Sequence, residues 1–510
     1  MRSMRLSLLA LSLVLTACPE KKPAPAAPDA SAEAPALPPV VTLLVTGSEN
    51  GYLLPNPDDS GVMRGGAAQI MGRWVKDFGH CVGKVKEDGS PACKDGNTLV
   101  LSTGDNANGA SISSFFDGNS ASETMGAMGY AASAFGNREL DFGREGFVAN
   151  RNLSGIKYLA ANLTETEDQA KWIHILPYAV FERRGQKIGV IGLTARKTLK
   201  TVMPGRAAGL QLEDEETVLG AAAKRLWDGG ASAVVLLSDD CLGEMKPVLE
   251  KHPEWKLAVV AGRQCEAEIG DKAGNTSLLY PGRHFNTFSV AKLTFDPSKP
   301  VAERLAKVET ESVEVVDDDK APAPEPKVAQ VVNGWKGRRD AVLGQVIGHT
   351  KSGVEQTSDL MTKWIANALR GEPISADVGL VNRKGIRQSV PAGPITRATI
   401  YDVLPFENSV VVATLLGEDL QKVLENPEAR AAGFTKKGKD WVDDKGKKLD
   451  PKKKYTLATT DYLYFGGDGF EIEKKDSAPN FTSQFWQTMV IDATGRLNSS
   501  EQFPLETKVK

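Results

Sequence analysis

Five short polar clusters hold the side chains of this sequence that are best suited to chemistry, and most of them directly follow an apolar run. In chain order the clusters are Thr46-Gly47-Ser48-Glu49-Asn50, Gly104-Asp105-Asn106, Gly136-Asn137-Arg138-Glu139, Leu237-Ser238-Asp239 and Gly262-Arg263-Gln264-Cys265. Asp105 is a carboxylate that is costly to bury alone, and Arg138 and Arg263 are the cations able to pair with it. Carboxylates and amides suit a divalent metal, whereas paired guanidinium groups suit a phosphate. The clusters contain both kinds of residue.

The elements that must position these clusters alternate between strands and helices. Apolar runs predict buried strands at 40–45, 98–102, 157–161, 187–193, 233–237 and 257–260, and helical patterns lie at 123–128 and 218–227. This alternation predicts a layered α/β domain over residues 40–305, in which the polar clusters lie where the strands stop and ligands bind.

A second folded unit, of the α+β class, is predicted over residues 336–510. It is expected to open with a helix at 360–369, followed by strands at 378–381, 410–414 and 455–459. Acidic and proline-rich composition around 309–327 predicts a linker between the two units, over 306–335.

Overall composition excludes little. The 510 residues are enough for two or three domains with full cores, and 41% hydrophobic with 25% charged residues is ordinary for globular proteins. The net charge of -3 gives no reason to expect nucleic acid as a partner. The chain has 5 histidines, none of them in a cluster, which limits the ligands available to zinc.

The N-terminus has the pattern of an export signal. Arg2 and Arg5 precede an apolar run that is too short to span a bilayer, and the run ends at Leu15-Thr16-Ala17-Cys18, which resembles a bacterial lipobox. That resemblance implies a lipoprotein signal peptide at residues 1–18, with cleavage before Cys18 and lipidation of the Cys18 thiol. The alternative is an ordinary cleaved signal peptide with a chance cysteine. The Pro- and Ala-rich stretch 19–39 is expected to be a flexible tether.

Four cysteines remain after Cys18, and export places them in an oxidising compartment. Cys81 and Cys93 are candidates for a disulfide that closes a short polar loop. Cys241 and Cys265 each follow a predicted strand end and are candidates for a second disulfide if those strands are neighbours. The alternative for Cys265 is a thiolate that binds metal.

The clusters resemble, in order and in local context, the five metal-site blocks of the 5′-nucleotidase family of dinuclear metallophosphoesterases. Against the family block Thr-Asn-Asp-x-His-Gly, Ser48 stands for the aspartate and Asn50 for the histidine. The block Gly-Asp-Asn is intact, which implies that Asp105 is the carboxylate that bridges the metals. In Gly-Asn-His-Glu-x-Asp, the resemblance makes Asn137 a metal ligand.

The catalytic pair of the family is altered in the same block. Asp141 falls on the aspartate of the His-Asp pair, but Arg138 replaces the histidine. The fourth block, Leu-Ser-His, ends in Asp239 here. The fifth, Gly-His-x-His or Gly-His-x-Gln, has Arg263 and Cys265 at its ligand positions. A binuclear site built this way is poor, so a divalent metal such as Zn or Mn is expected only if catalysis persists.

Three hypotheses for this site remain open. The guanidinium groups replace the lost metal charge and hold a phosphate, or they only fill and neutralise a dead site. In the third, a phosphoesterase site is rebuilt around one metal, with Asp105, Asn137, Asp239 and Cys265 as its ligands.

Three later segments resemble the nucleoside-binding blocks of the same family, at 381–387, 404–408 and 461–470. The resemblance implies that Phe406 and Tyr462 sandwich the base, that Asp468 binds ribose hydroxyls, and that Asn382 and Arg387 contact the base and the phosphate side.

The resemblance implies an α/β four-layer, calcineurin-like metallophosphoesterase domain followed by an α+β 5′-nucleotidase C-terminal domain for substrate recognition. The implied reaction is metal-dependent hydrolysis of nucleotide 5′-phosphates to nucleoside and phosphate, here impaired. Expected partners are a nucleotide or nucleoside-like molecule, a membrane reached through the lipid, and a protein, but no nucleic acid. The expected location is the bacterial cell envelope, facing the periplasm or the cell surface. The alternative is a structural or interaction lipoprotein.

Overall fold

Buried aliphatic runs form two six-stranded sheets in the N-terminal part of the chain. The computed structural model describes residues 38–58, 60–82, 96–166, 175–265, 270–476 and 479–509. The first sheet has the spatial order β16 (Leu305–Glu314), β15 (Thr287–Phe295), β1 (Val40–Thr46), β4 (Thr98–Ser102), β5 (Tyr130–Ala134) and β6 (Lys157–Leu159). The second has the order β13 (Lys272–Ala273), β14 (Thr276–Leu279), β12 (Val259–Arg263), β11 (Ala233–Cys241), β9 (Gln186–Leu193) and β8 (Tyr178–Arg183).

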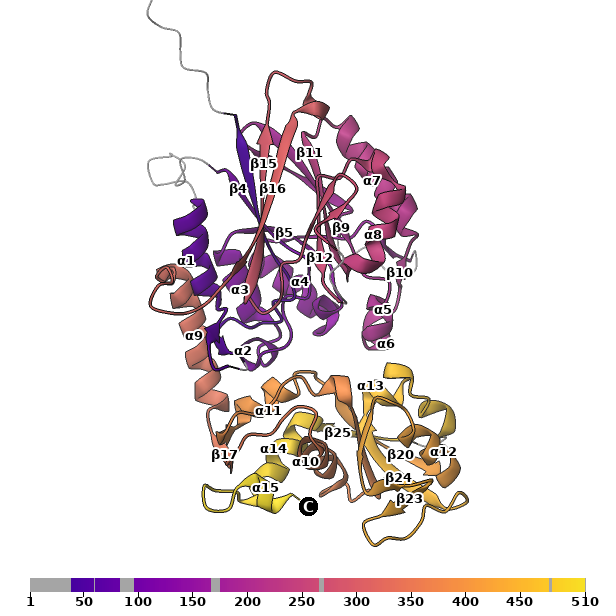
Figure 1. Ribbon diagram of the computed structural model, residues 1–510. Coiled ribbons are helices and arrows are strands. Elements are labelled where there is room, and N and C mark those ends of the chain that lie inside the picture. The colour runs from indigo at the N-terminus through magenta and orange to yellow at the C-terminus, as the bar shows by residue number, and fades with distance from the viewer. Residues whose placement is uncertain are drawn as a thin grey trace, which may run out of the picture. The chain divides into compact units, whose positions relative to one another are not determined.

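The alternation of side chains along each strand explains how the sheets stack. Val41, Leu43 and Val45 of β1 join the core between the two sheets, whereas Leu44 packs toward the helices. The outer face of the first sheet is covered by α1 (Ala67–Phe78), α3 (Asn119–Ala127), α4 (Gly143–Ser154) and α9 (Pro326–Leu343). The second sheet is covered by α7 (Glu215–Asp228) and α8 (Leu242–Lys251), on the other side in Figure 1. The arrangement is four layers, helix–sheet–sheet–helix, as expected.

The C-terminal part is built on one five-stranded sheet. Its order is β21 (Ala429–Ala432), β18 (Val378–Asn382), β24 (Lys454–Thr460), β20 (Ser409–Leu416) and β25 (Asn480–Phe485). One face packs on α10 (Asp359–Arg370), α11 (Arg397–Val403) and α14 (Trp486–Leu497). The other face packs on α12 (Gly417–Leu424) and α13 (Asp461–Tyr464). This is the α+β domain that the sequence predicts.

Shorter elements complete the described chain. The two-stranded sheets are β2 (Asn56–Pro57) with β3 (Met63–Arg64), β7 (Leu163–Glu165) with β10 (Leu210–Leu212), β17 (Val346–Thr350) with β19 (Gly393–Thr396), and β22 (Phe434–Lys437) with β23 (Asp440–Asp443). The four-residue helices not yet named are α2 (Ser111–Ser114), α5 (Thr198–Thr201), α6 (Pro204–Ala207) and α15 (Leu505–Lys508).

The segment 306–335, which was predicted to be a linker, has regular structure along most of its length. Residues up to Glu314 form β16, whose charged side chains are exposed because an edge strand needs only backbone pairing with β15. The proline-rich stretch ends in a helix start, since Pro326 opens α9 and the Glu325 carboxylate caps it through the Val328 N–H. The helix at 360–369 therefore does not open the second unit, because α9 and β17 precede it.

Two predicted features lie outside the described residues. Cys18 and most of the tether at 19–39 are among residues 1–37, and Cys93 lies between the described segments 60–82 and 96–166. Cys81 is disulfide-bonded. Its pairing with Cys93 stays a prediction.

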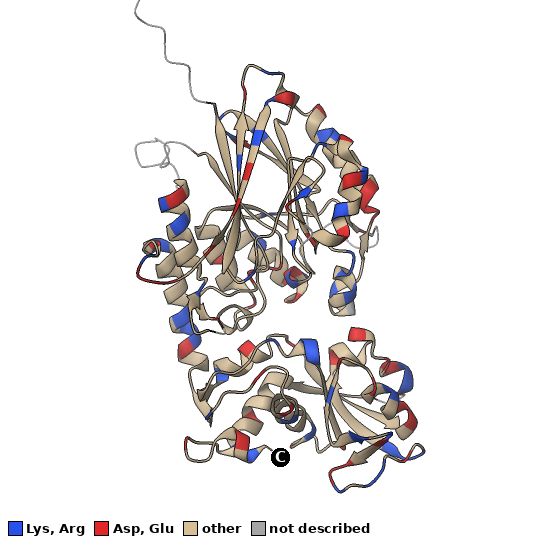
Figure 2. Cartoon of the chain, in the orientation of Figure 1, with Lys and Arg blue, Asp and Glu red and all other residues tan. Residues whose placement is uncertain are grey.

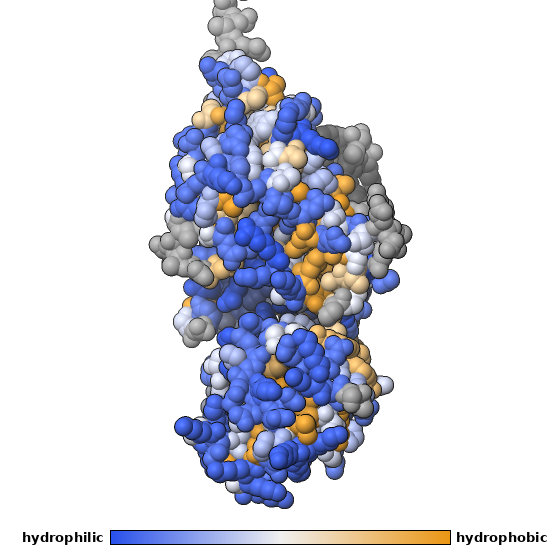
Figure 3. Space-filling view, turned by 90° about the vertical axis from the view of Figure 1, so that its right-hand side faces the viewer, coloured by the Kyte–Doolittle hydropathy of each residue, from blue (hydrophilic) through white to orange (hydrophobic). Residues whose placement is uncertain are grey.

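The chain from Pro39 to Lys510 forms one compact unit. Cationic and anionic residues are interspersed along its elements, as Figure 2 shows, in agreement with the net charge of -3. The face in Figure 3 is mostly hydrophilic, with smaller hydrophobic areas between. Among the described residues, no helix is both long and apolar enough to cross a bilayer.

Candidate functional site

The carboxyl ends of five strands bring the predicted metal positions together. β1, β4 and β5 run parallel in the first sheet, and β11 and β12 run parallel in the second. A pocket of about 1000 Å³ opens at these ends. Its lining includes most of the positions that the resemblance assigns to metal ligands and to the catalytic pair, namely Ser48, Asn50, Asp105, Asn137, Arg138, Arg263 and Cys265.

The loops at this pocket have an unusual backbone. Ser48, Asn50 and Asp105 adopt left-handed conformations, with φ of 47°, 47° and 61°. Gly136 is needed beside them, because a Cβ there would come within 2.5 Å of the Asp105 Oδ1 atom. Such conformations cost energy and persist only where the surroundings fix them.

Glu139 fixes the loop that contains Asp105. Its buried carboxylate accepts backbone N–H bonds from Asp105, Asn106 and Gly136, at 3.2, 2.9 and 2.9 Å. It therefore ties the end of β4 to the end of β5. Burial, together with the charge of Asp105, raises the pKa of Glu139 to about 8.

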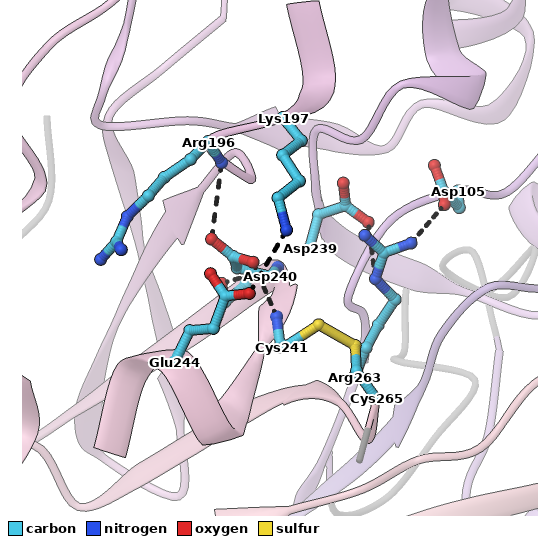
Figure 4. The surroundings of a disulfide bond; sticks show 10 residues. Asp105, Arg196, Lys197, Asp239, Asp240, Cys241, Glu244, Arg263 and Cys265 are labelled. Atoms are coloured by element: carbon cyan, nitrogen blue, oxygen red, sulfur yellow. Dashed lines mark hydrogen bonds and ion pairs between the residues drawn. A yellow bond between two sulfur atoms is a disulfide. The ribbon is translucent and has the colours of Figure 1, made fainter. Parts of the chain in front are cut away.

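Arg263 lies between the two aspartates of the predicted metal site, as Figure 4 shows. Its Nη1 donates to the Asp105 Oδ2 at 3.2 Å, and its Nε is 3.7 Å from the Asp239 Oδ1. Neither Nε nor that Oδ1 has a hydrogen-bond partner among the described residues. Burial, and then the charge of Asp105, raises the pKa of Asp239 well above its ordinary range, and Arg263 opposes this.

These residues do not fit a pair of divalent cations. A guanidinium group occupies the space where the carboxylates of Asp105 and Asp239 converge, and it repels a metal there. Ser48 and Asn50 add only neutral oxygens. Among the described residues, the group whose ligand atoms all lie within 4.8 Å is Asp240, Cys241 and Glu244, and its cysteine is in a disulfide. No reaction step is therefore assigned to a metal.

Arg138, at the position that the resemblance assigns to the catalytic histidine, pairs with Asp141. Its Nη1 donates to the Asp141 Oδ2 at 3.0 Å, and the same oxygen accepts from the Asn108 Nδ2 at 2.7 Å. The backbone N–H of Arg138 donates to the Asp105 Oδ1 at 3.1 Å. Its guanidinium carbon lies 4.6 Å from the centre of the Phe406 ring, a cation–π distance.

The predicted nucleoside-binding residues also meet, in an adjoining pocket of about 140 Å³. Its lining contains all of them: Asn382, Arg387, Phe406, Tyr462 and Asp468. The Asn382 Nδ2 donates to the Asp468 Oδ2 at 2.7 Å, and the Tyr462 hydroxyl to the Oδ1 at 3.4 Å. The residues shared by both pockets are Asn108, Arg138, Arg387 and Phe406.

Arg387 is held at this junction by few contacts. Its Nη1 donates to the Lys384 carbonyl at 3.1 Å, and its guanidinium carbon is 5.7 Å from the centre of the Phe406 ring. Burial, and then repulsion by Arg138, lowers the pKa of Arg387 to about 10. An anion at the junction would relieve that repulsion.

Cys241 and Cys265 form a disulfide that joins the ends of the neighbouring strands β11 and β12. Cys265 is therefore not a free thiolate in this structure. The site rebuilt around one metal, which needed that thiolate, loses a ligand.

Sequence patterns missed several residues of the large pocket. His284 stacks on Tyr52, with ring centres 3.7 Å apart, and Arg283 lines the same wall. Burial, then Arg283 and Arg387, lowers the pKa of His284 to about 3. The left-handed φ of 57° at His284 has no sequence signature, and the residue lies far along the chain from any cluster.

Known proteins with similar sequences span most of the chain. Residues 344–440 match the family described as 5′-nucleotidase, C-terminal domain. Protein UshA of Yersinia enterocolitica is 24% identical, with 79% of this chain and 82% of that protein covered. The NAD 5′-nucleotidase of Haemophilus influenzae is 23% identical, with 74% and 77% covered.

Solved structures agree on the fold. The crystal structure of a 5′-nucleotidase precursor from Thermus thermophilus superposes with a TM-score of 0.74 at 20% identity, covering 92% of this chain and 99% of that one. The expected fold class is confirmed. In sequence and fold, the chain is similar to the 5′-nucleotidases: a calcineurin-like α/β domain is followed by a domain that matches the 5′-nucleotidase C-terminal family.

Proposed function

We propose that this protein binds a nucleotide-like ligand whose phosphate is held by arginines instead of by two metal ions. Two of the proteins that it resembles are 5′-nucleotidases by name. In this proposal, hydrolysis of a nucleotide 5′-phosphate by two metal ions is impaired, but binding of the nucleotide is retained.

The observation that carries the proposal is the meeting of Arg138, Arg263 and Arg387 on one pocket. They come from the end of β5, the end of β12 and the loop after β18, so the fold, not one segment, gathers them. Guanidinium groups bind phosphate oxygens in bidentate geometry. The pocket of about 1000 Å³ has room for more than one phosphate group.

The nucleoside end supports the same ligand. Arg138, Arg387 and Phe406 line both pockets, so a phosphate bound by the two arginines has the nucleoside-binding residues beside it. Stacking on an aromatic ring contributes about 1–3 kcal/mol per base and accepts every base. The nucleobase is therefore left open in this proposal.

Impairment follows from the chemistry of the substituted residues. An arginine remains charged at any pH that a protein tolerates, so Arg138 cannot exchange a proton as a histidine does. It can only stabilise negative charge beside Asp141. Arg263 opposes the metals that would activate water.

Phosphate release from a panel of nucleotides tests this part. The soluble form that begins after Cys18 is incubated with Mn, Zn, Co or Mg, beside an Asp105→Asn control. We expect no turnover above that control, and stabilisation against heat by a nucleoside monophosphate. Turnover that Asp105→Asn abolishes would instead establish a rebuilt metal enzyme. If the protein shows no turnover and no stabilisation, the remaining interpretation is a structural or interaction protein.

We also propose that the protein is exported and anchored in the cell envelope through a lipid on Cys18. The lipobox-like run that ends at Cys18 and the Pro- and Ala-rich residues after it support this. Metabolic labelling with a fatty-acid analogue should mark the protein, and Cys18→Ser should remove the label. Labelling of both forms would contradict the anchor.

A further inference from the structure

The strand that carries Asp239 leaves its neighbour just where the site begins. Leu237 of β11 pairs with Ala261 of β12, but the next register pair is Cys241 with Arg263. Four residue steps on β11 therefore face two steps on β12, which is a β-bulge. Asp239 lies inside the bulge and faces Arg263 (Figure 4).

Arg263 ends β12, where Cys241 with Arg263 is the only register pair past the bulge among the described residues. Two residues further on, the disulfide from Cys265 to Cys241 adds a covalent tie between the same two strand ends. The two Cα atoms it joins are 5.5 Å apart, and it closes the segment between residues 24 positions apart. The covalent bond thus reinforces, on the far side of the bulge, the single register pair of Cys241 with Arg263 by which the ladder resumes.

The Arg263 side chain depends on that connection. It is held by one hydrogen bond, to Asp105, because its Nε is 3.7 Å from the Asp239 Oδ1. Its side chain is 34% exposed, so packing alone does not fix it. A shift of the strand end by about one ångström would break the charge-assisted bond.

We infer that the Cys241–Cys265 disulfide is a positioning element for Arg263, and that its reduction weakens the phosphate end of the site while leaving the nucleoside end intact. This rests on the proposed function. A dithiol reductant supplies two electrons and two protons, the S–S bond becomes two thiols, and the reductant becomes a disulfide.

Paired ligands separate this role from general stabilisation. The Kd values of adenosine 5′-monophosphate and of adenosine are measured for the oxidised protein and for Cys241→Ser/Cys265→Ser. The nucleotide should bind about tenfold more weakly to the variant, and adenosine equally well. Equal weakening of both ligands, or of neither, would overturn the inference.

A double-mutant cycle with Arg263→Gln shows whether the disulfide acts through that residue. If it does, removing both cysteines in the Arg263→Gln background has no further effect on nucleotide affinity. Two additive losses would contradict the inference and indicate an independent, structural effect.

Two further arms keep the outcome interpretable. Wild-type protein treated with dithiothreitol, under conditions where circular dichroism shows it folded, replaces the serine variant if that variant does not fold. The serine variant in turn isolates the effect from the other disulfide, at Cys81. Failure of the oxidised wild type to bind the nucleotide would instead disprove the proposed function.

Discussion

The proposed phosphate end and the proposed nucleoside end of this site differ in how far their residues depart from the family blocks. At the phosphate end, Arg263 and Arg138 stand where the family resemblance places histidines, and each pairs with an aspartate of the same site. At the nucleoside end, Asn382 and Tyr462 both donate hydrogen bonds to the carboxylate of Asp468. In the proposed function, the metal chemistry of the first end is replaced, whereas the second end keeps the residues expected to recognise a nucleoside.

This contrast shows that a similar fold does not imply the same activity. A fold that collects strand ends at one place collects whatever residues stand there, so it cannot by itself guarantee a metal. Buried carboxylates such as those of Asp105 and Asp239 need a cation nearby, because an unpaired buried charge is costly. The Arg263 guanidinium group meets that need here.

The largest effect is expected from removing the cation at the phosphate end. Arg263→Met leaves Asp105 and Asp239 without it, so the free energy of unfolding should fall by about 3 kcal/mol, as for broken buried pairs. Urea unfolding measures the loss. Arg283→Met is the control, because Arg283 lines the same pocket without an ion pair among the described residues, and it should cost less than about 0.5 kcal/mol. Equal losses would mean that Arg263 only fills space.

A second change removes the ring at the nucleoside end. Phe406→Ala should weaken adenosine binding by about 1–3 kcal/mol, because one stacking face is lost. Calorimetric titration measures the affinity. The control is Phe485→Ala, an exposed ring on β25 outside both pockets, 49% exposed, which should bind adenosine as the wild type does. If Phe406→Ala also binds normally, Phe406 is only a core aromatic.

A smaller effect is expected at the ribose position. Asn382→Ala removes the donor that holds the Asp468 Oδ2, so adenosine affinity should fall by about 1 kcal/mol. Asn333→Ala, on the exposed face of α9, serves as the matched control. Binding of 2′-deoxyadenosine should be less sensitive to Asn382→Ala than binding of adenosine, and equal sensitivity would argue against a ribose contact.

The last prediction concerns the loss of stability in acid, at a residue outside both pockets. His80 is buried, with ring nitrogens 2.8 Å from the Thr98 Oγ1 and 2.9 Å from the Met128 carbonyl oxygen, and burial lowers its pKa. The unfolded chain then binds a proton more readily, so stability present above pH 6.5 is lost as the pH falls below it. His80→Gln should remove about 1 kcal/mol of the loss between about pH 7 and pH 5.5. Unfolding curves with an unchanged pH dependence would contradict this.

Much of the fold was predictable because its core strands are strongly apolar. The runs at β1, β4, β9 and β11 are buried along nearly their whole length, and such runs have few alternatives to a central strand. β16 was missed because an edge strand is charged and exposed on most of its length. The start of α9 was missed because its proline-rich lead looks like a linker.

The site was predictable where function depends on residues that directly follow a strand. Asp105, Arg138 and Arg263 could be placed in this way. His284 and Tyr52 could not, because their stacking arises from a loop whose conformation no local pattern specifies. Contacts such as that of Arg138 with Phe406 join residues 268 positions apart in the sequence. Only the folded chain shows them.

The most direct test of the account is a calorimetric titration of the oxidised protein with adenosine 5′-monophosphate, once with EDTA and once with Mn. If guanidinium groups and not metal ions hold the phosphate, the Kd should be the same with EDTA and with Mn. The variants Arg138→Gln and Arg263→Gln should bind the nucleotide more weakly. Binding that requires Mn, and that Asp105→Asn abolishes while Arg263→Gln preserves it, would contradict the account.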